Sequence, residues 1–186
     1  MQVQTWLREI ADLTAEEAQA IDSKLIPFSC KKNTLLLKQG HSCEYIYFIE
    51  KGFARAFYTK NGKDATTWFA RENDIITSMY ALITKRKSNE SIEILEDASL
   101  LRIDYEELQI LYNIYPNLNR LGRILLEKYF VELEERTLSL QFDSALERYQ
   151  QLITRQPYVL QRASLGQIAS FLGMSQITLS RIRSSR

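Results

Sequence analysis

The sequence predicts an α+β protein. Its first part should form an antiparallel β-roll or jelly-roll-like barrel with flanking helices, followed by a long helix and a C-terminal all-α helix-turn-helix unit. Three observations predict this order: short β-rich runs in the first half, one helical pattern of about 24 residues after them, and two short helical patterns separated by a glycine at the end.

Length and composition are those of an ordinary globular protein. The chain has 186 residues, of which 45% are hydrophobic and 25% charged, enough for one large or two small domains. No stretch approaches the roughly 18 apolar residues of a membrane span, and the N-terminus lacks a basic region followed by a long apolar run. We therefore expect a cytoplasmic protein without a membrane partner.

The residue types needed for catalysis or metal binding are scarce. His41 is the single histidine, and Cys30 and Cys43 are the two cysteines, too few for a four-ligand zinc or iron–sulfur site. No Ser-His-Asp set and no phosphate-cradling glycine-rich loop is visible. We predict no catalytic residue, no metal and no cofactor.

The N-terminal residues 5–24 predict a pair of helices. Trp6, Leu7 and Ile10 fall on one helical face, and Thr14 with Glu17 has the spacing of a capping box that begins the second helix. A helix pair packed on the domain core explains this pattern.

Between Pro27 and Ile103 the period shortens to that of strands. Turn residues separate the runs, most clearly Asn61-Gly62, which favours a hairpin. Runs of this length at this spacing are typical of an antiparallel sandwich or barrel. The predicted strands are residues 34–38, 45–50, 53–59, 65–69, 91–95 and 99–103.

A short helix over residues 105–115 precedes a long one over 117–140, with Pro116 suited to its first turn. The long helix is apolar on more than one face and would span roughly 36 Å, more than one domain of this size covers. We expect a second copy of the chain on it, although a purely intrachain core helix is the alternative. The residues expected at the dimer interface are Leu118, Leu121, Leu125, Tyr129 and Leu133.

The domain boundary is predicted at residues 142–144. Phe142-Asp143-Ser144 interrupts the helical pattern, and Ser144 with Glu147 forms a capping box for a helix that continues to Pro157. This divides the chain into a sensor domain, 1–142, and a C-terminal unit, 143–186. Because the second unit is too small for a large core, it should pack on the barrel or on a dimer mate.

The last 23 residues predict a helix-turn-helix. Ser164 and Gln167 form a capping box for the first helix, Gly173 can adopt the positive φ of a sharp turn, and Ser175 is an N-cap for the second helix. Leu179 and Ile182 should face the first helix. The residues then directed outward are Gln176, Ile177, Ser180, Arg181 and Ser184.

Charge favours DNA as the partner of this unit over an αα-hairpin that only closes a domain. Residues 148–186 contain six arginines and no Lys, Asp or Glu, a formal +6, whereas residues 1–147 hold 18 basic and 23 acidic residues, a formal −5. A phosphate backbone would attract the second part and repel the first.

The chain resembles the Crp/Fnr family of bacterial transcription regulators over nearly its whole length. Residues 47–55, YFIEKGFAR, look like the family's strand-and-glycine signature, and residues 145–149 and 168–183 look like its DNA-binding half. The resemblance implies a cyclic-nucleotide-binding-type β-roll, a dimer helix and a DNA-reading helix-turn-helix. By position, Gln176, Ile177 and Arg181 would contact bases, and Ser175 and Thr178 phosphates.

The complete expected DNA-binding set is Ser175, Gln176, Ile177, Thr178, Ser180, Arg181 and Arg183. We expect Arg162, before the first helix, to contact phosphate only. Ile177 departs from the family, which often has an acidic residue there that accepts from cytosine. No wing hairpin follows Arg186, so we expect no contact from a wing to the DNA backbone.

The nucleotide motif of the family is also altered. Cyclic-nucleotide-responsive relatives hold the phosphate with an arginine followed by Ser or Thr, and the ribose with a Gly-Glu pair. Here Thr77-Ser78 replaces that pair and Glu90 stands in place of the arginine, so we expect no cyclic AMP or cyclic GMP binding in the manner of those relatives. The effector-pocket candidates are Thr77, Ser78, Met79, Glu90 and Ser91.

The sequence therefore predicts a dimeric, sequence-specific DNA-binding regulator rather than an enzyme. Its expected partners are double-stranded DNA, a second copy of the chain and an unknown small-molecule effector, with RNA polymerase as a further candidate. The alternative is a ligand-sensing signalling module whose helix-turn-helix is a protein interface.

Overall fold

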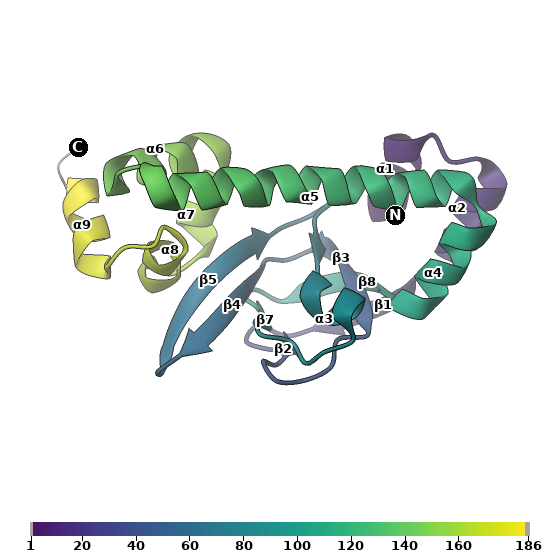
Figure 1. Ribbon diagram of the computed structural model, residues 1–186, viewed down its shortest axis with the longest axis horizontal. Coiled ribbons are helices and arrows are strands. Elements are labelled where there is room, and N and C mark those ends of the chain that lie inside the picture. Colours follow the sequence, from purple (N-terminus) through teal and green to yellow (C-terminus); the bar gives the residue numbers. More distant parts are fainter. Residues whose placement is uncertain (1, 185–186) are drawn as a thin grey trace.

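One long helix organises the molecule. In the computed structural model, which describes residues 2–184, helix α5 (Pro116–Phe142) runs along nearly the whole length, with the β-roll beneath it (Figure 1). The N-terminal helices lie at one end of α5 and the C-terminal helices at the other. The two predicted parts of the chain are thus joined by a single element.

The elements follow the predicted order. The other helices are α1 (Gln2–Ala11), α2 (Ala15–Asp22), α3 (Met79–Thr84), α4 (Tyr105–Ile114), α6 (Ala145–Arg155), α7 (Val159–Arg162), α8 (Leu165–Phe171) and α9 (Gln176–Ser184). The strands are β1 (Ile26–Cys30), β2 (Leu35–Leu37), β3 (Tyr45–Lys51), β4 (Ala54–Lys60), β5 (Lys63–Ala70), β6 (Ile75–Ile76), β7 (Ser91–Ile94) and β8 (Ala98–Asp104). The sequence had not indicated β1, β6, α3 or α7.

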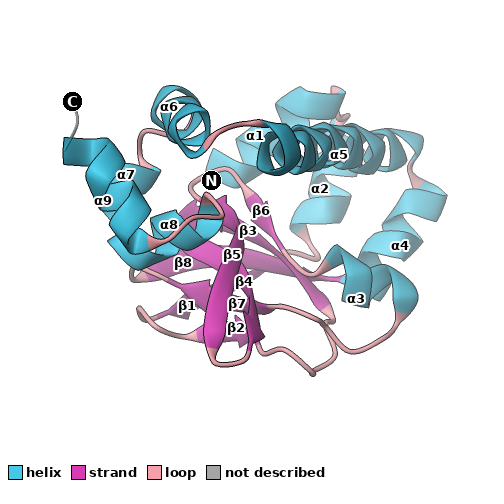
Figure 2. Ribbon diagram, turned by 60° about the vertical axis from the view of Figure 1, so that its left-hand side comes forward, coloured by secondary structure: helices cyan, strands magenta, loops and turns pink. Residues whose placement is uncertain are grey.

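The strands form two antiparallel sheets of four, in the orders β1-β8-β3-β6 and β2-β7-β4-β5 (Figure 2). Alternation along β3 explains how the sheets are covered. Tyr47 and Ile49 point into the core between the sheets, whereas Ile46 and Phe48 join the core beneath the helices. The sandwich interpretation is confirmed.

The N-terminal helices pack on the first half of α5. Thr14 caps α2 through the predicted capping box with Glu17. The Glu17 carboxylate also accepts from the backbone and side-chain amides of Asn117, at 3.3 and 3.0 Å, which ties α2 to the start of α5. These hydrogen bonds hold the Glu17 pKa below its usual range.

Most of the predicted dimer stripe lies inside the chain's own core, so its three buried residues are not available for an interface. Leu118, Leu121 and Leu125 are buried in the core shared with α1, α2 and α4. Tyr129 packs on Trp68 of β5, with ring centroids 5.2 Å apart, and its hydroxyl accepts from the Ile75 backbone N–H at 2.9 Å. Periodicity located an apolar stripe on α5, but it is the stripe that faces the chain's own core.

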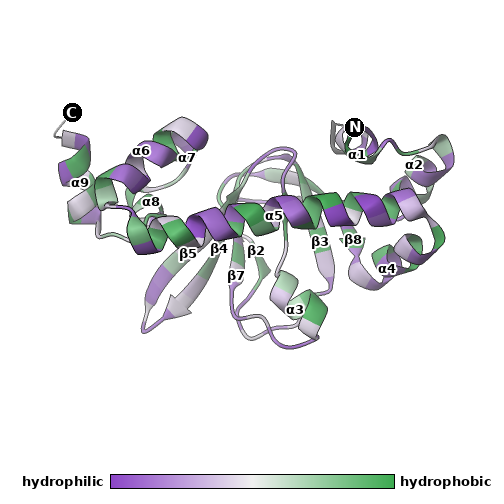
Figure 3. Cartoon of the chain, turned by 45° about the horizontal axis from the view of Figure 1, so that its top comes forward, coloured by the Kyte–Doolittle hydropathy of each residue, from purple (hydrophilic) through white to green (hydrophobic). Residues whose placement is uncertain are grey.

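A different face of α5 is apolar and exposed. Leu126, Phe130 and Leu133 have 50%, 67% and 57% of their surface exposed. They follow one another at spacings of four and three residues, and Leu140, 40% exposed, continues the same face. Figure 3 shows hydrophobic residues between hydrophilic ones along this exposed side of α5.

The C-terminal unit begins at the predicted break and shares a core with the β-roll. Ser144 caps α6 through the capping box with Glu147. Phe53, Phe69 and Leu95 of the β-roll then pack in one buried cluster with residues of the C-terminal helices, fully buried Leu179 among them. The expected packing of this small unit on the β-roll is confirmed.

Candidate nucleic-acid interface

The two helices of the C-terminal motif begin as predicted. The Ser164 hydroxyl accepts from the Gln167 backbone N–H at 3.3 Å, and the Gln167 side chain accepts from the Ser164 N–H at 2.9 Å. At the start of α9, the Ser175 hydroxyl accepts from the Thr178 backbone N–H at 3.1 Å. These caps satisfy amides that a helix start leaves without partners.

Gly173 makes the turn between α8 and α9. Its φ of +64° lies in the left-handed region, where a side chain is unfavourable. The next residue, Met174, donates its backbone N–H to the Ala169 carbonyl at 3.0 Å and closes the end of α8. At the start of α8, a Cβ on Gly166 would lie 2.8 Å from the Gln176 side-chain nitrogen, so the Gln176 side chain of α9 reaches back to α8.

Helix α9 presents a mostly polar outer face. Leu179 is fully buried and Ile182 is half-buried against the C-terminal core, as expected from their spacing. The exposed fraction of Ile177 is 66%, which places an apolar side chain within the outer face. The exposed polar residues of α9 and its cap are Ser175, Gln176, Ser180, Arg181, Arg183 and Ser184, with Thr178 half-buried beside Ser175.

Arg162 is engaged within the chain. Its guanidinium donates to both carboxylate oxygens of Glu72, at 2.8 and 3.0 Å, and to both of Glu96, at 3.0 and 2.7 Å. The prediction that Arg162 contacts phosphate is therefore wrong for this arrangement, because two carboxylates already occupy its donors. The hydrogen bonds from Arg162 lower the pKa of Glu72 to about 2.

Two further arginines of the acid-free segment are also engaged within the chain. Arg155 forms an ion pair with Glu135 of α5. Arg148 donates to the backbone carbonyls of Leu172 and Asp143, at 2.8 and 2.6 Å. Arg181 and Arg183 are exposed, and Arg186 lies outside the described residues. The arginine count alone therefore overstated the charge available on the surface of the C-terminal unit.

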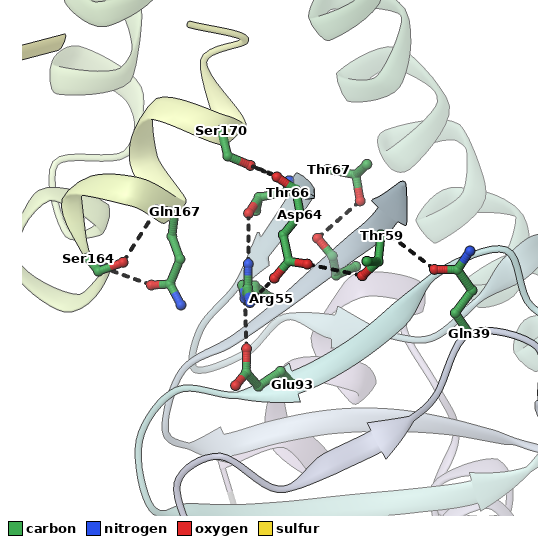
Figure 4. A network of polar contacts seen from close by, with 11 residues as sticks. Gln39, Arg55, Thr59, Asp64, Thr66, Thr67, Glu93, Ser164, Gln167 and Ser170 are labelled. Atoms are coloured by element: carbon green, nitrogen blue, oxygen red, sulfur yellow. Dashed lines mark hydrogen bonds and ion pairs between the residues drawn. The ribbon is translucent and has the colours of Figure 1, made fainter. Parts of the chain in front are cut away.

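Helix α8 is bonded to the edge of the β-roll. The Ser170 hydroxyl accepts from the Thr66 backbone N–H at 2.6 Å and donates to the Asp64 carbonyl at 3.1 Å, which occupies the open edge of β5 (Figure 4). Beside this contact, Arg55 pairs with Asp64 at 2.9 Å and Glu93 at 2.8 Å. No local pattern indicates this role for Ser170, because its partners are more than 100 residues away in the chain.

The effector-pocket candidates lie near one another around α3 and β7. The Thr77 hydroxyl donates to the Tyr45 carbonyl at 2.8 Å, and buried Ser78 accepts from the Ser88 hydroxyl at 3.1 Å. Burial raises the pKa of Glu90, against the effect of hydrogen bonds from Ser78 and Thr67.

The other two candidates have structural roles. The Ser91 hydroxyl accepts from the Gln39 backbone N–H at 2.9 Å, and Met79 is the half-buried first residue of α3.

Within residues 2–184, no group of three or more His, Cys, Asp or Glu side chains is arranged to hold a metal ion. In the same part of the chain, no helix combines the length and apolar character needed to cross a bilayer.

Comparison with known proteins supports the family resemblance. The cyclic nucleotide-binding domain model matches residues 27–115, which include both sheets except the first residue of β1. No curated protein matches the sequence. The family match therefore covers the β-roll and α4 but not the C-terminal helices.

Solved structures extend the likeness to the C-terminal unit. FixK2 from Bradyrhizobium japonicum is 20% identical, with 87% of this chain and 83% of FixK2 covered, at a TM-score of 0.72. The catabolite activator protein of Thermus thermophilus is also 20% identical, with 93% and 83% covered and a TM-score of 0.60. A protein of Eubacterium rectale assigned to the Crp/Fnr family is 16% identical, with 92% and 82% covered and a TM-score of 0.73. Residues 27–115 thus match the cyclic nucleotide-binding domain model, and the chain shares its fold with solved structures that include a Crp/Fnr-type transcription regulator.

Proposed function

We propose that the protein is a sequence-specific DNA-binding transcription regulator of the Crp/Fnr type. The observation that carries the proposal is the exposed face of α9, on a helix whose opposite face is fixed in the core by Leu179. Amide, hydroxyl and guanidinium groups on one helix face match the donors and acceptors of base edges in a major groove.

Within this face, Arg181 and Gln176 are assigned to bases. Arginine can donate two hydrogen bonds to guanine, and glutamine can bond adenine in the same bidentate way. Ser175, Thr178, Ser180 and Arg183 serve as backbone or supporting contacts. Exposed Ile177 can touch only a thymine methyl group, so we expect a thymine preference or no preference at its position.

The regulator acts as a homodimer in this proposal, through the exposed α5 face defined by Leu126, Phe130, Leu133 and Leu140. An apolar stripe of this length is unfavourable in water, and its spacing of three and four residues suits a parallel helix pair. Paired helices would place two copies of α9 on neighbouring major grooves, about 34 Å apart along the DNA. In this proposal, the effector is sensed by residues 1–142 and the DNA is bound by residues 143–186.

The sensor unit does not recognise cyclic AMP or cyclic GMP in this proposal. Glu90 lies in the region where nucleotide-responsive relatives are expected to have an arginine, and its surroundings are partly desolvated. A carboxylate facing a phosphate there would be repulsive by several kcal/mol at an effective dielectric of about 20. RNA polymerase remains a candidate partner, and the cytoplasm the expected compartment.

The alternative is a signalling module whose helix-turn-helix binds another protein. The exposed Ile177 favours it, since an apolar side chain in the centre of the α9 face also suits a protein contact. The two functions differ in what they bind.

A selection from random double-stranded oligonucleotides with the full-length protein tests the proposal. We expect enrichment of a two-fold symmetric sequence with half-sites one helical turn apart. A library that stays random after repeated rounds at low salt contradicts DNA recognition and favours the alternative.

A further inference from the structure

A cavity of about 390 Å³ lies between the β-roll and the C-terminal unit, where β5, α5, α6 and α8 meet. Its volume is within the range of small-molecule sites, roughly 300–1,000 Å³. The aromatic part of its wall comes from both units: Trp68 and Phe69 lie on β5, Phe171 on α8, and Tyr158 just before α7. The cavity is separate from the effector candidates around α3 and β7.

Its charged lining has an excess of cations. Five basic and three acidic side chains line the cavity. Two of the acids already have partners, since Glu135 pairs with Arg155 and Glu132 with Lys128. The remaining acid, Asp74, accepts from the backbone N–H of Arg71 at 3.1 Å.

Three arginines are left, and Arg136 is the most informative of them. It is half-buried and donates to the carbonyls of Phe171 and Thr66, at 2.9 and 3.1 Å. Among residues 2–184, no carboxylate forms an ion pair with it. Burial alone lowers the pKa of Arg136, to about 10, because its charge has lost water without gaining a counter-ion.

The other two arginines add charge at the same cavity. The Arg71 guanidinium lies 4.3 Å from the centroid of the Tyr158 ring, which directs it along the aromatic wall. Arg148 is held by two backbone carbonyls rather than by a carboxylate side chain. An anion in the cavity would therefore meet three guanidinium groups opposed by Asp74.

One polar group of the lining lacks a hydrogen-bond partner among the described residues. The Gln156 Oε1 atom at the end of α6 is buried and, within the described chain, accepts no hydrogen bond. A buried acceptor without a donor costs about 1–3 kcal/mol, so such groups usually meet a bound molecule or an ordered water.

We propose that this cavity binds a small aromatic acid: a flat ring that contacts the aromatic walls and an anionic carboxylate or phosphate beside the arginines. A ligand or an ordered water that donates to Gln156 would satisfy its buried oxygen. Because the walls belong to both units, a bound molecule would stabilise their present arrangement. The proposal concerns the free protein and does not depend on DNA binding.

Calorimetry on the full-length protein with 1-naphthoate and with uncharged 1-naphthamide tests the charge requirement. We expect 1-naphthoate to bind with a dissociation constant in the millimolar range or below, and the amide at least about ten-fold more weakly, a difference of about 1.4 kcal/mol. Equal affinities, or no heat from millimolar 1-naphthoate, would overturn the proposal.

A pair of variants tests the location. Arg71→Gln should weaken 1-naphthoate binding about ten-fold, because it removes one lining cation from an exposed position and leaves the fold intact. Arg123→Gln, on an exposed part of α5 outside the cavity, is the matched control and should have no effect. Equal affinity in wild type and Arg71→Gln would place the ligand elsewhere and overturn the assignment.

Thermal unfolding provides a second reading of the same assignment. The unfolding midpoint should rise with 1-naphthoate in wild type and rise less in Arg71→Gln. Failure of these experiments leaves the oligonucleotide selection unaffected, and the reverse also holds, so the two proposals can fail separately.

Discussion

Arg162 and Glu72 lie 90 residues apart in the chain and are joined by two hydrogen bonds of 2.8 and 3.0 Å. Glu72 also accepts from the Gly52 backbone N–H at 2.9 Å, and Arg162 also binds Glu96. One arginine of the C-terminal unit thereby bridges two loops of the β-roll. This bridge, with Ser170 on the edge of β5, holds the C-terminal helices on the β-roll.

The first prediction concerns the pH dependence of this bridge. The Glu72 pKa is about 2 in the folded protein, below its ordinary 4.5. Its contribution to stability is therefore complete above pH 4.5 and is lost as the pH falls towards 2. Arg162→Gln should lower the free energy of unfolding at pH 7 by about 1 kcal/mol, a modest amount because water screens the partly exposed pair.

Chemical denaturation at pH 7 and at steps down to pH 2 checks this prediction. The variant should approach wild-type stability as the pH falls through that window, because the bridge is then lost in both proteins. Arg123→Gln, which breaks an exposed pair with Glu127, is the control. A constant difference between variant and wild type from pH 7 to 2 contradicts the assignment.

The second prediction concerns Gly52, between β3 and β4. Its φ is +114°, and a Cβ there would lie 2.7 Å from the Ala98 Cβ. Gly52→Ala should cost at least about 2 kcal/mol of unfolding free energy. The matched control is Gly62, whose φ is +72° and where an added Cβ would have nothing within 4 Å. Gly62→Ala should therefore cost only about 1 kcal/mol of unfolding free energy. Equal losses on denaturant unfolding would show that the contact with Ala98 relaxes.

The third prediction compares the exposed apolar face of α5, which includes Phe130, with its buried face, which includes Leu125. Phe130→Glu, at a position 67% exposed, should convert the proposed dimer to a folded monomer. Leu125→Glu, at a position 9% exposed, should unfold the N-terminal core because it buries a charge. Sedimentation with circular dichroism distinguishes the outcomes. A folded wild-type monomer at micromolar concentration would exclude the proposed dimer.

The fourth prediction is negative. Cyclic AMP and cyclic GMP should give no heat of binding at micromolar concentrations, because Glu90 would repel the cyclic phosphate. A micromolar dissociation constant for either nucleotide would show that a cation reaches the phosphate in place of the expected arginine.

Local signals in the sequence were reliable guides to the fold. The three capping boxes, Thr14 with Glu17, Ser144 with Glu147 and Ser164 with Gln167, all form, because each depends on residues three apart. The runs predicted as strands lie in β2, β3, β4, β5, β7 and β8, within two residues at each end. Short β6 and α7 carried too few residues to show a period.

Contacts between distant residues could not be predicted in this way. The periodicity of α5 indicates apolar surface on several sides, but not that Leu125 faces inward and Phe130 outward, since that depends on where α1 and α4 dock. Arg162 looked like a free cation because its carboxylate partners belong to loops far away in the chain. A single sequence contains no signal for either arrangement.

The most direct test of the central claim is the ratio of specific to non-specific DNA binding in wild type and Arg181→Ala. Wild type should prefer its selected sequence over a scrambled one, and Arg181→Ala should lose about 1–3 kcal/mol of binding free energy on the selected sequence with a much smaller loss on the scrambled one. Equal losses on both DNAs, at matched salt, would mean that Arg181 contacts only phosphate and that α9 does not read sequence through it.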